Sequence, residues 1–279
     1  MTFKTVFMAV GAGQDEAELD RGVAIARALD AHLEVLVLGI APPPPASPYG
    51  VVSNDLWAGE IREGQDEAQT RAAAIEAKLA GTGELRCEVD AQFIDRGTVA
   101  TLAARYARYA DLTLIAPQAP GVETMQTWVL NGALFESGRP ILLLPKGPTS
   151  FPRAETIMIG WDASVEASKA VRDAIGLMKA AREVHAVLID PVPSFEGHGP
   201  EPGADLAAYL ARHGIKAVVH RLPREGKETG EMLRRTASDL GADLIVMGGF
   251  GHSRLRERIF GGTTTSMMKN VIVPVLMAH

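Results

Sequence analysis

Short apolar runs alternate with longer amphipathic stretches along this chain. In the C-terminal half the apolar runs predict strands at about 155–161, 183–189, 216–222, 243–247 and 271–277. Between these runs, apolar residues recur at the spacing of a helix, as in Val171, Ala174, Ile175 and Met178. Such alternation is typical of βαβ units around a parallel sheet whose two faces are both buried. The pattern therefore predicts an α/β fold with a doubly wound parallel sheet.

The chain also contains an internal repeat. Segment 110–115 (ADLTLI) resembles segment 242–247 (ADLIVM), and apolar runs that each contain a proline follow both segments about 30 residues later. The Gly, Pro and Ser residues of segment 146–152 indicate a short linker between the two copies. We therefore predict two tandem domains of the same α/β class, at residues 1–150 and 151–279.

Composition and charge exclude several classes of protein. The formal net charge of −6 argues against a dedicated nucleic-acid binder, which needs a surplus of Lys and Arg. Cys87 is the single cysteine, which excludes an intramolecular disulfide and a multi-cysteine metal site. No run approaches the roughly 18 apolar residues of a membrane helix, and the apolar run Val6–Val10 is too short for a signal peptide. We expect a cytoplasmic protein without nucleic-acid or membrane partners.

A glycine-rich stretch directly follows the fourth strand of the second copy. Gly248, Gly251 and Gly261 have the spacing G-x2-G-x9-G, and Gly262 and Thr263 come next. Ligands of open parallel sheets bind beyond the carboxyl ends of strands, where glycines and helix N-termini expose backbone N–H groups to phosphates. The stretch favours a phosphate site, although it matches neither a P-loop nor a dinucleotide fingerprint. Glycines that only shape turns are the alternative, but the first copy lacks the series at the same place.

Three segments together resemble the universal stress protein family. They are Gly160-Trp161-Asp162-Ala163-Ser164 after the first strand of the second copy, Leu188-Ile189-Asp190 at the end of the second strand, and the glycine series. The resemblance covers essentially the whole chain as a tandem pair and is strongest over residues 155–190 and 240–279. It implies Rossmann-like domains of the adenine nucleotide alpha hydrolase-like kind and a role in the stress response.

The resemblance also implies a ligand, because this glycine motif marks family members that bind ATP or a related adenine nucleotide. The implied site for ATP or another adenine nucleotide, with Mg²⁺ as a candidate companion, consists of Asp162, Leu188, Gly248, Gly251, Gly261, Gly262 and Thr263. The first two residues would flank the adenine, and the glycines with Thr263 would follow the ribose and phosphates. Gly262 stands where the family usually has Ser or Thr, so Thr263 would have to supply the hydroxyl.

Other polar residues carry less specific signals. A basic group near the glycines could screen a polyphosphate or simply be solvated: His252, Arg254, Arg256 and Arg258. Asp162 could coordinate Mg²⁺ or act as a base, but an aspartate that forms a turn at a strand end is the more common case. The remaining histidines show no spacing that specifies a metal, and His185 and His213 are expected to be structural. We therefore predict no catalytic residue and no metal ligand.

The first copy has Gly11 where the second has Asp162, so we predict a degenerate first domain that pairs with the second in place of a homodimer partner. A further homodimer is an additional expectation. The leading function is a non-enzymatic stress-response protein with one adenine nucleotide in the C-terminal domain and at most weak ATPase activity. The alternatives are a slow adenine-nucleotide hydrolase and an interaction module in which strand 271–277 pairs edge to edge with another copy.

Overall fold

The computed structural model describes residues 3–12, 16–43, 54–81, 85–117, 124–195, 197–250 and 262–279, with the side chains of 54–56 excepted. The chain divides into two compact units. The first consists of Phe3–Leu114 and Thr124–Ser137, and the second consists mainly of Gly138–His279. No helix in these described ranges is long and apolar enough to cross a membrane.

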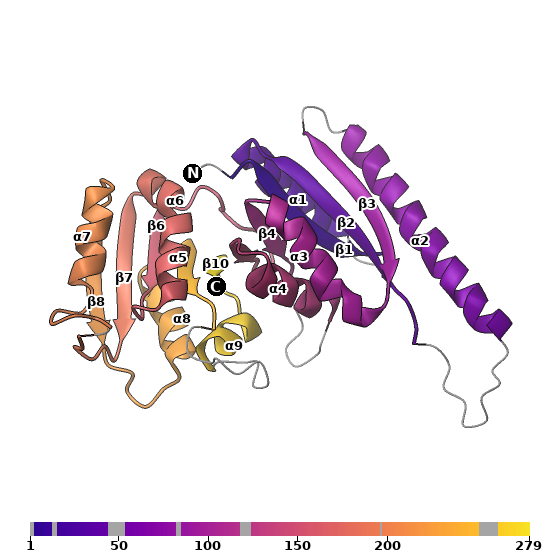
Figure 1. Cartoon of the computed structure of the whole chain (residues 1–279). Helices are drawn as coiled ribbons and strands as arrows, with labels where there is room; N and C mark the ends of the chain where they lie inside the picture. The colour runs from indigo at the N-terminus through magenta and orange to yellow at the C-terminus, as the bar shows by residue number, and fades with distance from the viewer. Residues whose placement is uncertain are drawn as a thin grey trace, which may run out of the picture. The chain divides into compact units, whose positions relative to one another are not determined.

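The first unit is a parallel sheet in the strand order β3-β2-β1-β4 with helices between the strands (Figure 1). Its strands are β1 (Thr5–Gly11), β2 (His32–Ile40), β3 (Cys87–Ile94) and β4 (Leu112–Ile115). Its helices are α1 (Glu16–Leu29), α2 (Asn54–Ala80), α3 (Val99–Tyr109), which follows a 3-10 turn at Arg96–Thr98, and α4 (Met125–Glu136).

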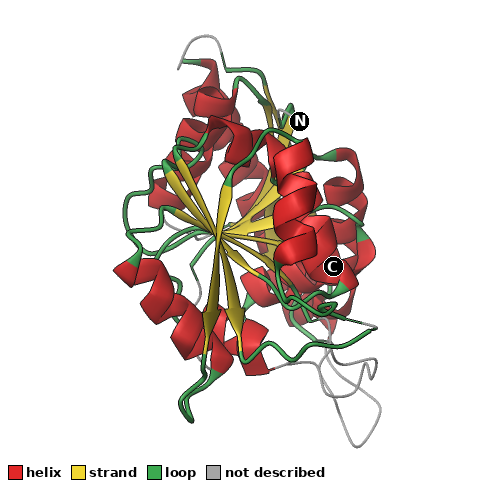
Figure 2. Cartoon of the chain, turned by 90° about the vertical axis from the view of Figure 1, so that its left-hand side faces the viewer, coloured by secondary structure: helices red, strands yellow, loops and turns green. Residues whose placement is uncertain are grey.

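The second unit has the strand order β5-β10-β9-β6-β7-β8. Its strands are β5 (Ile141–Leu143), β6 (Thr156–Gly160), β7 (Glu183–Ile189), β8 (Ala217–Leu222), β9 (Leu244–Gly248) and β10 (Val275–Ala278). Its helices are α5 (Val165–Asp173), α6 (Ile175–Ala180), α7 (Ala204–Arg212), α8 (Thr229–Asp239) and α9 (Gly262–Lys269). Figure 2 looks along this row of strands and shows them twisting against one another with helices on both sides. The predicted α/β class with a mostly parallel sheet is confirmed.

The order β8-β7-β6-β9 reproduces the order β3-β2-β1-β4, as the sequence repeat predicts. β5 and β10 end the two copies and pair with each other in antiparallel register, with Val275 opposite Leu143. Because of this pairing, β5 and the predicted linker 146–152 fall in the second unit. The boundary near residue 150 stays a prediction about the repeat.

The last strand is shorter than the apolar run suggests. We expected it to span 271–277, but β10 begins at Val275. The carbonyl of Pro274 accepts a hydrogen bond from the amide of Ile245, whereas a proline has no N–H with which to continue the ladder on its other side. β10 then lies between β9 and β5, so it is not an edge strand of the second unit.

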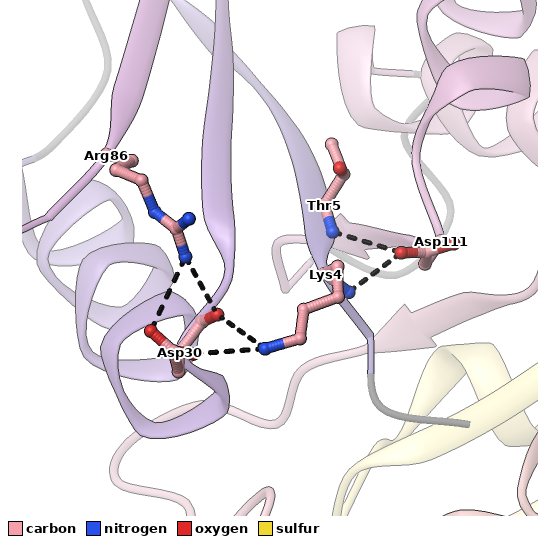
Figure 3. Close-up of polar contacts among 5 residues, drawn as sticks. All are labelled: Lys4, Thr5, Asp30, Arg86 and Asp111. Atoms are coloured by element: carbon pink, nitrogen blue, oxygen red, sulfur yellow. Dashed lines mark hydrogen bonds and ion pairs between the residues drawn. The ribbon is translucent and has the colours of Figure 1, made fainter.

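Each copy holds the start of its first strand with one aspartate. Asp111 Oδ2 accepts hydrogen bonds from the amides of Lys4 (2.7 Å) and Thr5 (3.1 Å), as Figure 3 shows. In the second copy Asp243 Oδ2 accepts from the amides of Glu155 (2.9 Å) and Thr156 (3.0 Å). These residues are the Asp of the repeated ADL segments, so that repeat has a physical function: it fixes the fourth strand beside the first.

Ion pairs around the first clamp are exposed and contribute less. Asp30 pairs with Lys4 at 3.0 Å and with Arg86 at 3.4 Å (Figure 3). The Lys4 ammonium, followed by Arg86, lowers the pKa of Asp30 below its usual value. Because all these side chains are largely in solvent, the pairs add little to the free energy of unfolding.

The aspartate clamp yields a prediction about stability. Asp243→Ala leaves two backbone N–H groups without their charged acceptor, and we expect the free energy of unfolding to fall by about 1–3 kcal/mol. Asp243→Asn keeps one acceptor oxygen in place and should lose clearly less. Urea denaturation followed by circular dichroism measures both, and equal losses in the two variants would contradict the assignment.

Glu34 of β2, which is half-buried beside carboxylates of β3, yields a prediction about pH. Burial raises the pKa of Glu34 above 4.5, and Glu88 and Asp90 raise it further. The folded state therefore binds this proton more tightly than the unfolded state, so stability is lost as the pH rises from about 4.5 through the folded pKa.

We expect Glu34→Gln to be more stable than the parent at pH 7 and to match it near pH 4. Thermal denaturation across this range measures the difference. Glu60→Gln, at an exposed position of α2, is the control and should change the free energy of unfolding by less than about 0.5 kcal/mol. A Glu34→Gln advantage that is the same at both pH values would show that the effect is not electrostatic.

Candidate functional site

The carboxyl edge of the second unit brings together predicted residues from three strands. The amide of Trp161 donates to the carbonyl of Val187 at 2.9 Å, so the residue after β6 is still hydrogen-bonded to β7. On the other side Gly160 pairs with Met247 of β9. Asp162, Leu188 and Gly248 therefore follow neighbouring strands at one edge, where open parallel sheets bind ligands.

Asp162 lies in the turn that starts α5. Its side chain is exposed, and Oδ1 accepts a hydrogen bond from the amide of Ser164 at 3.0 Å. Ser164 in turn caps α5 by accepting from the amide of Ala167 at 3.0 Å. The expected turn-forming role is thus present, and it holds the carboxylate at the edge of the sheet.

Leu188 faces away from a ligand at this edge. Its side chain is fully buried, and a Cδ atom lies 3.2 Å from the position of a Cβ on Gly203, just before α7. The side chain therefore fills the layer between the sheet and α7. Only the main chain of Leu188 is placed to meet an adenine, and its role there stays a prediction.

Gly248 has a packing reason to be glycine. A Cβ at this position would lie 2.5 Å from the amide nitrogen of Ala167 and 2.9 Å from the carbonyl carbon of Glu166. The first turn of α5 therefore packs directly on the end of β9. The missing side chain lets the two predicted ligand-binding segments, the turn after β6 and the end of β9, approach each other closely.

The N-terminus of α9 is tied to the end of β9. The amide of Phe250 donates to Thr264 Oγ1 at 3.1 Å, and the amide of Gly249 donates to the carbonyl of Ala278 at 2.9 Å. Phe250 adopts a left-handed backbone with φ 61°, a conformation that costs a residue with a side chain about 1 kcal/mol. These contacts hold the first turn of α9 at the carboxyl edge of the sheet.

Within that turn, Gly262 is exposed and a Cβ there would meet nothing within 4 Å. Thr263 is half-buried, and its carbonyl lies 3.1 Å from the Cβ position of Gly230 in α8. The hydroxyl of Thr265 is buried and has no hydrogen-bond partner among the described residues. Other predicted residues lie outside the described ranges, namely Gly251, Gly261, His252, Arg254, Arg256 and Arg258.

Two clefts among the described residues do not include the predicted residues. One of about 420 Å³ lies beyond the ends of β7 and β8, lined by Asp190, Arg221, Glu201, Leu222 and five prolines. Another of about 310 Å³ lies at the matching place of the first unit and includes Leu38, Gly64 and Phe93. The proline-rich segment after β7 was the available sequence signal for the first cleft, and the sequence analysis did not use it.

His185, which we expected to be structural, has two polar neighbours. Its Nδ1 lies 3.0 Å from Nε2 of His220, and its Nε2 lies 3.4 Å from a carboxylate oxygen of Glu183. Spacing along the chain does not reveal this pair, because the two residues meet across neighbouring strands. The ring of His213 instead packs edge-on against Tyr209 at 4.7 Å, a structural role. No group of three or more His, Cys, Asp or Glu suited to a metal occurs among the described residues.

Comparison with known proteins decides the family. A model of the universal stress protein family matches residues 154–279. These residues belong to the universal stress protein family. The curated universal stress protein Slr1230 of Synechocystis sp. is 27% identical over 142 residues, which are 50% of this chain and 46% of that protein. The chain therefore spans about half the length of this relative.

Solved universal stress proteins also resemble the whole chain in fold. One from Archaeoglobus fulgidus superposes with a TM-score of 0.67 at 18% identity, over 98% of this chain and 95% of its own. A second structure, described as a putative universal stress protein of Pseudomonas aeruginosa, has a TM-score of 0.56 at 16% identity, over 98% and 92% of the two chains. At such identities the likeness concerns the fold, and it extends over both units.

The universal stress protein domain offers a matched pair of glycines for a test of the site. Gly248→Ala drives a Cβ into the backbone of α5, and we expect it to lower the free energy of unfolding by about 1–3 kcal/mol. Gly262→Ala meets open space at the start of α9 and should change it by less than about 1 kcal/mol. Chemical denaturation compares the two variants, and similar values would contradict the close approach of β9 and α5.

Proposed function

We propose that this chain is a stress-response protein that binds ATP or a related adenine nucleotide at the carboxyl edge of its C-terminal domain, without substantial turnover. The predicted binding residues are Asp162, Leu188, Gly248, Gly251, Gly261, Gly262 and Thr263. The domains are the predicted 1–150 and 151–279, with nucleotide in the second. The cytoplasmic location and a further homodimer stay predictions.

One observation supports this proposal most: the first turn of α9 is held at the carboxyl end of β9. The unpaired N–H groups of a helix N-terminus, together with its positive dipole end, favour phosphate oxygens. The Phe250–Thr264 hydrogen bond puts this turn at the edge where the Asp162 turn and the end of β7 also lie. An adenine nucleotide that extends along this edge would meet the β6 turn at one end and α9 at the other.

The first unit supports a single nucleotide per chain. β1 runs in register with β2 from Thr5 opposite His32, as β6 runs with β7 from Thr156 opposite Glu183. Gly11 then corresponds to Asp162, so the first unit has a glycine at the position of that carboxylate. The interaction-module alternative loses support, because β10 already pairs on both sides within the second unit.

The test starts with the nucleotide that co-purifies with the protein, followed by calorimetry with ATP, ADP and AMP, with and without Mg²⁺. We expect one adenine nucleotide per chain and a rise in melting temperature. When the free nucleotide is at 100 times its Kd, the free energy of unfolding should increase by about 2.7 kcal/mol. Release of inorganic phosphate over hours distinguishes binding from slow hydrolysis. If no nucleotide binds at millimolar concentration, the proposal is wrong.

Variants in the first turn of α9 make the test specific. Thr263→Val removes the hydroxyl with little change in shape, and we expect it to weaken binding about 10-fold, the effect of one lost hydrogen bond. Gly262→Ser restores the usual hydroxyl of the family in open space and should strengthen binding. The double variant Gly251→Val, Gly261→Val should abolish binding, provided that circular dichroism shows the native fold. Unchanged affinity in all three would place the nucleotide elsewhere.

A further inference from the structure

Two histidines meet on the outer strands of the second unit. His185 belongs to β7 and His220 to β8, the edge strand of this unit, and His220 lies opposite Val187 in the parallel register. Their rings are 5.2 Å apart between centroids and tilted by 44°, with Nδ1 of His185 and Nε2 of His220 separated by 3.0 Å. Neither histidine belongs to the predicted nucleotide-binding residues, and each lies at least two residues before the end of its strand.

The hydrogen positions follow from Glu183. Its carboxylate lies 3.4 Å from Nε2 of His185 and can only accept when ionised, so this Nε2 carries the hydrogen. The other nitrogen of His185, Nδ1, then carries no hydrogen and has a free lone pair. It accepts the hydrogen that His220 carries on Nε2. One N–H···N hydrogen bond, from Nε2 of His220 to Nδ1 of His185, thus joins the two rings.

The pair lies within reach of solvent. His185 is 9% exposed, His220 is half-buried, and Val218 beside them on β8 is 49% exposed. Neutral imidazole is the form that ligates transition metals. Water and ions can approach from the exposed side of β8.

We propose that His185 Nδ1 and His220 Nε2 form a two-nitrogen site for a divalent transition ion of square-planar preference, Cu(II) above all. When the ion binds, the hydrogen on Nε2 of His220 moves through solvent to Nδ1 of the same ring, so both imidazoles stay neutral ligands, and water completes the coordination. With nitrogen–metal distances of about 2.0–2.1 Å, a nitrogen separation of 3.0 Å corresponds to an angle of about 90° at the metal. This is the angle between neighbouring ligands in a square plane, whereas tetrahedral Zn²⁺ needs the nitrogens about 3.4 Å apart.

Glu183 acts as a positioning residue in this site. A carboxylate that accepts from the far nitrogen of a ligand histidine fixes its tautomer and raises its basicity. Arg182 lies 3.4 Å from the other carboxylate oxygen of Glu183 and helps to hold the carboxylate in place. The result is a carboxylate–histidine–metal arrangement on one sheet face.

The first unit provides an internal comparison. The strand registers make Glu34 the counterpart of His185 and Asp90 the counterpart of His220. The first unit therefore places carboxylates where the second places imidazoles. Carboxylates prefer Mg²⁺, Ca²⁺ or Mn²⁺, whereas imidazoles suit Cu²⁺ and Ni²⁺. The proposed site is thus specific to the second unit.

The experiment uses the full chain without an affinity tag, in a weakly coordinating buffer at pH 7.5, titrated with copper(II) chloride and, separately, zinc chloride. We expect one Cu(II) per chain with an electron paramagnetic resonance spectrum of a tetragonal ion that carries two nitrogen ligands. Zinc should bind at least 10-fold more weakly, in line with the Irving–Williams order and the bite angle.

Variants separate ligands from neighbours. His185→Gln and His220→Gln should each lower the copper affinity at least 10-fold, and Glu183→Gln should lower it by about 10-fold through the loss of the outer carboxylate. His213→Gln, on the helix α7 cap, is the matched control and should bind as the parent does. Equal copper binding by the parent and by both ligand variants would overturn the proposal, as would a spectrum without two nitrogen ligands.

A measurement on the parent protein removes dependence on the folding of any variant. Substoichiometric Cu(II) should broaden the ring resonances of His185 and His220 in a proton–nitrogen spectrum before those of any other histidine. Broadening that starts at other histidines or at the N-terminus would overturn the proposal, because the ion would then reside elsewhere.

Discussion

The two aspartate clamps determine where everything else in each copy lies. Asp111 and Asp243 each accept hydrogen bonds from two consecutive amides at the start of a first strand, and each directly precedes a fourth strand. Strands advance by a fixed rise of about 3.3 Å per residue, so fixing their amino ends also fixes their carboxyl ends. In the second copy this brings the turn at Asp162 beside Gly248. A pair of hydrogen bonds at one end of the sheet thus sets the geometry of the candidate site at the other end.

Much of this fold could be predicted from the apolar runs. Strands β6 to β9 lie within a residue of their predicted bounds at every end, and the repeat predicted the common strand order. The run at 271–277 was longer than the strand, because Pro274 cannot extend the ladder. A continuous apolar run also hides which side chains face which helix layer, so the inward direction of Leu188 was not predictable from its pattern.

The candidate site was predictable only in part. Chain order placed Asp162, Leu188 and Gly248 at or just after the ends of strands, and the parallel sheet then brings such positions to one edge. The histidine pair was missed, because a cross-strand contact depends on lateral register, which spacing along the chain does not contain. The packing need of Gly248 against α5 was hidden for the same reason. Residues that sequence analysis assigns to a ligand can therefore also serve the fold, as Gly248 and Asp162 do.

The pairing of β5 with β10 has a consequence for how the chain comes to be folded as it leaves the ribosome. These strands are joined residue to residue, with Leu142 opposite Leu276, although most of the second copy separates them in sequence. Phe3–Leu114 and Thr124–Ser137 can assemble while synthesis continues, since their strands and helices pair with one another. β5 emerges soon afterwards but has no β10 to meet until the rest of the second copy has been made. The backbone groups of this apolar strand can then pair with other chains, and the pairing of strands so distant in sequence is slow. The four-residue strand β10 thus completes the hydrogen bonding of β5 only after the rest of the second copy has been synthesised.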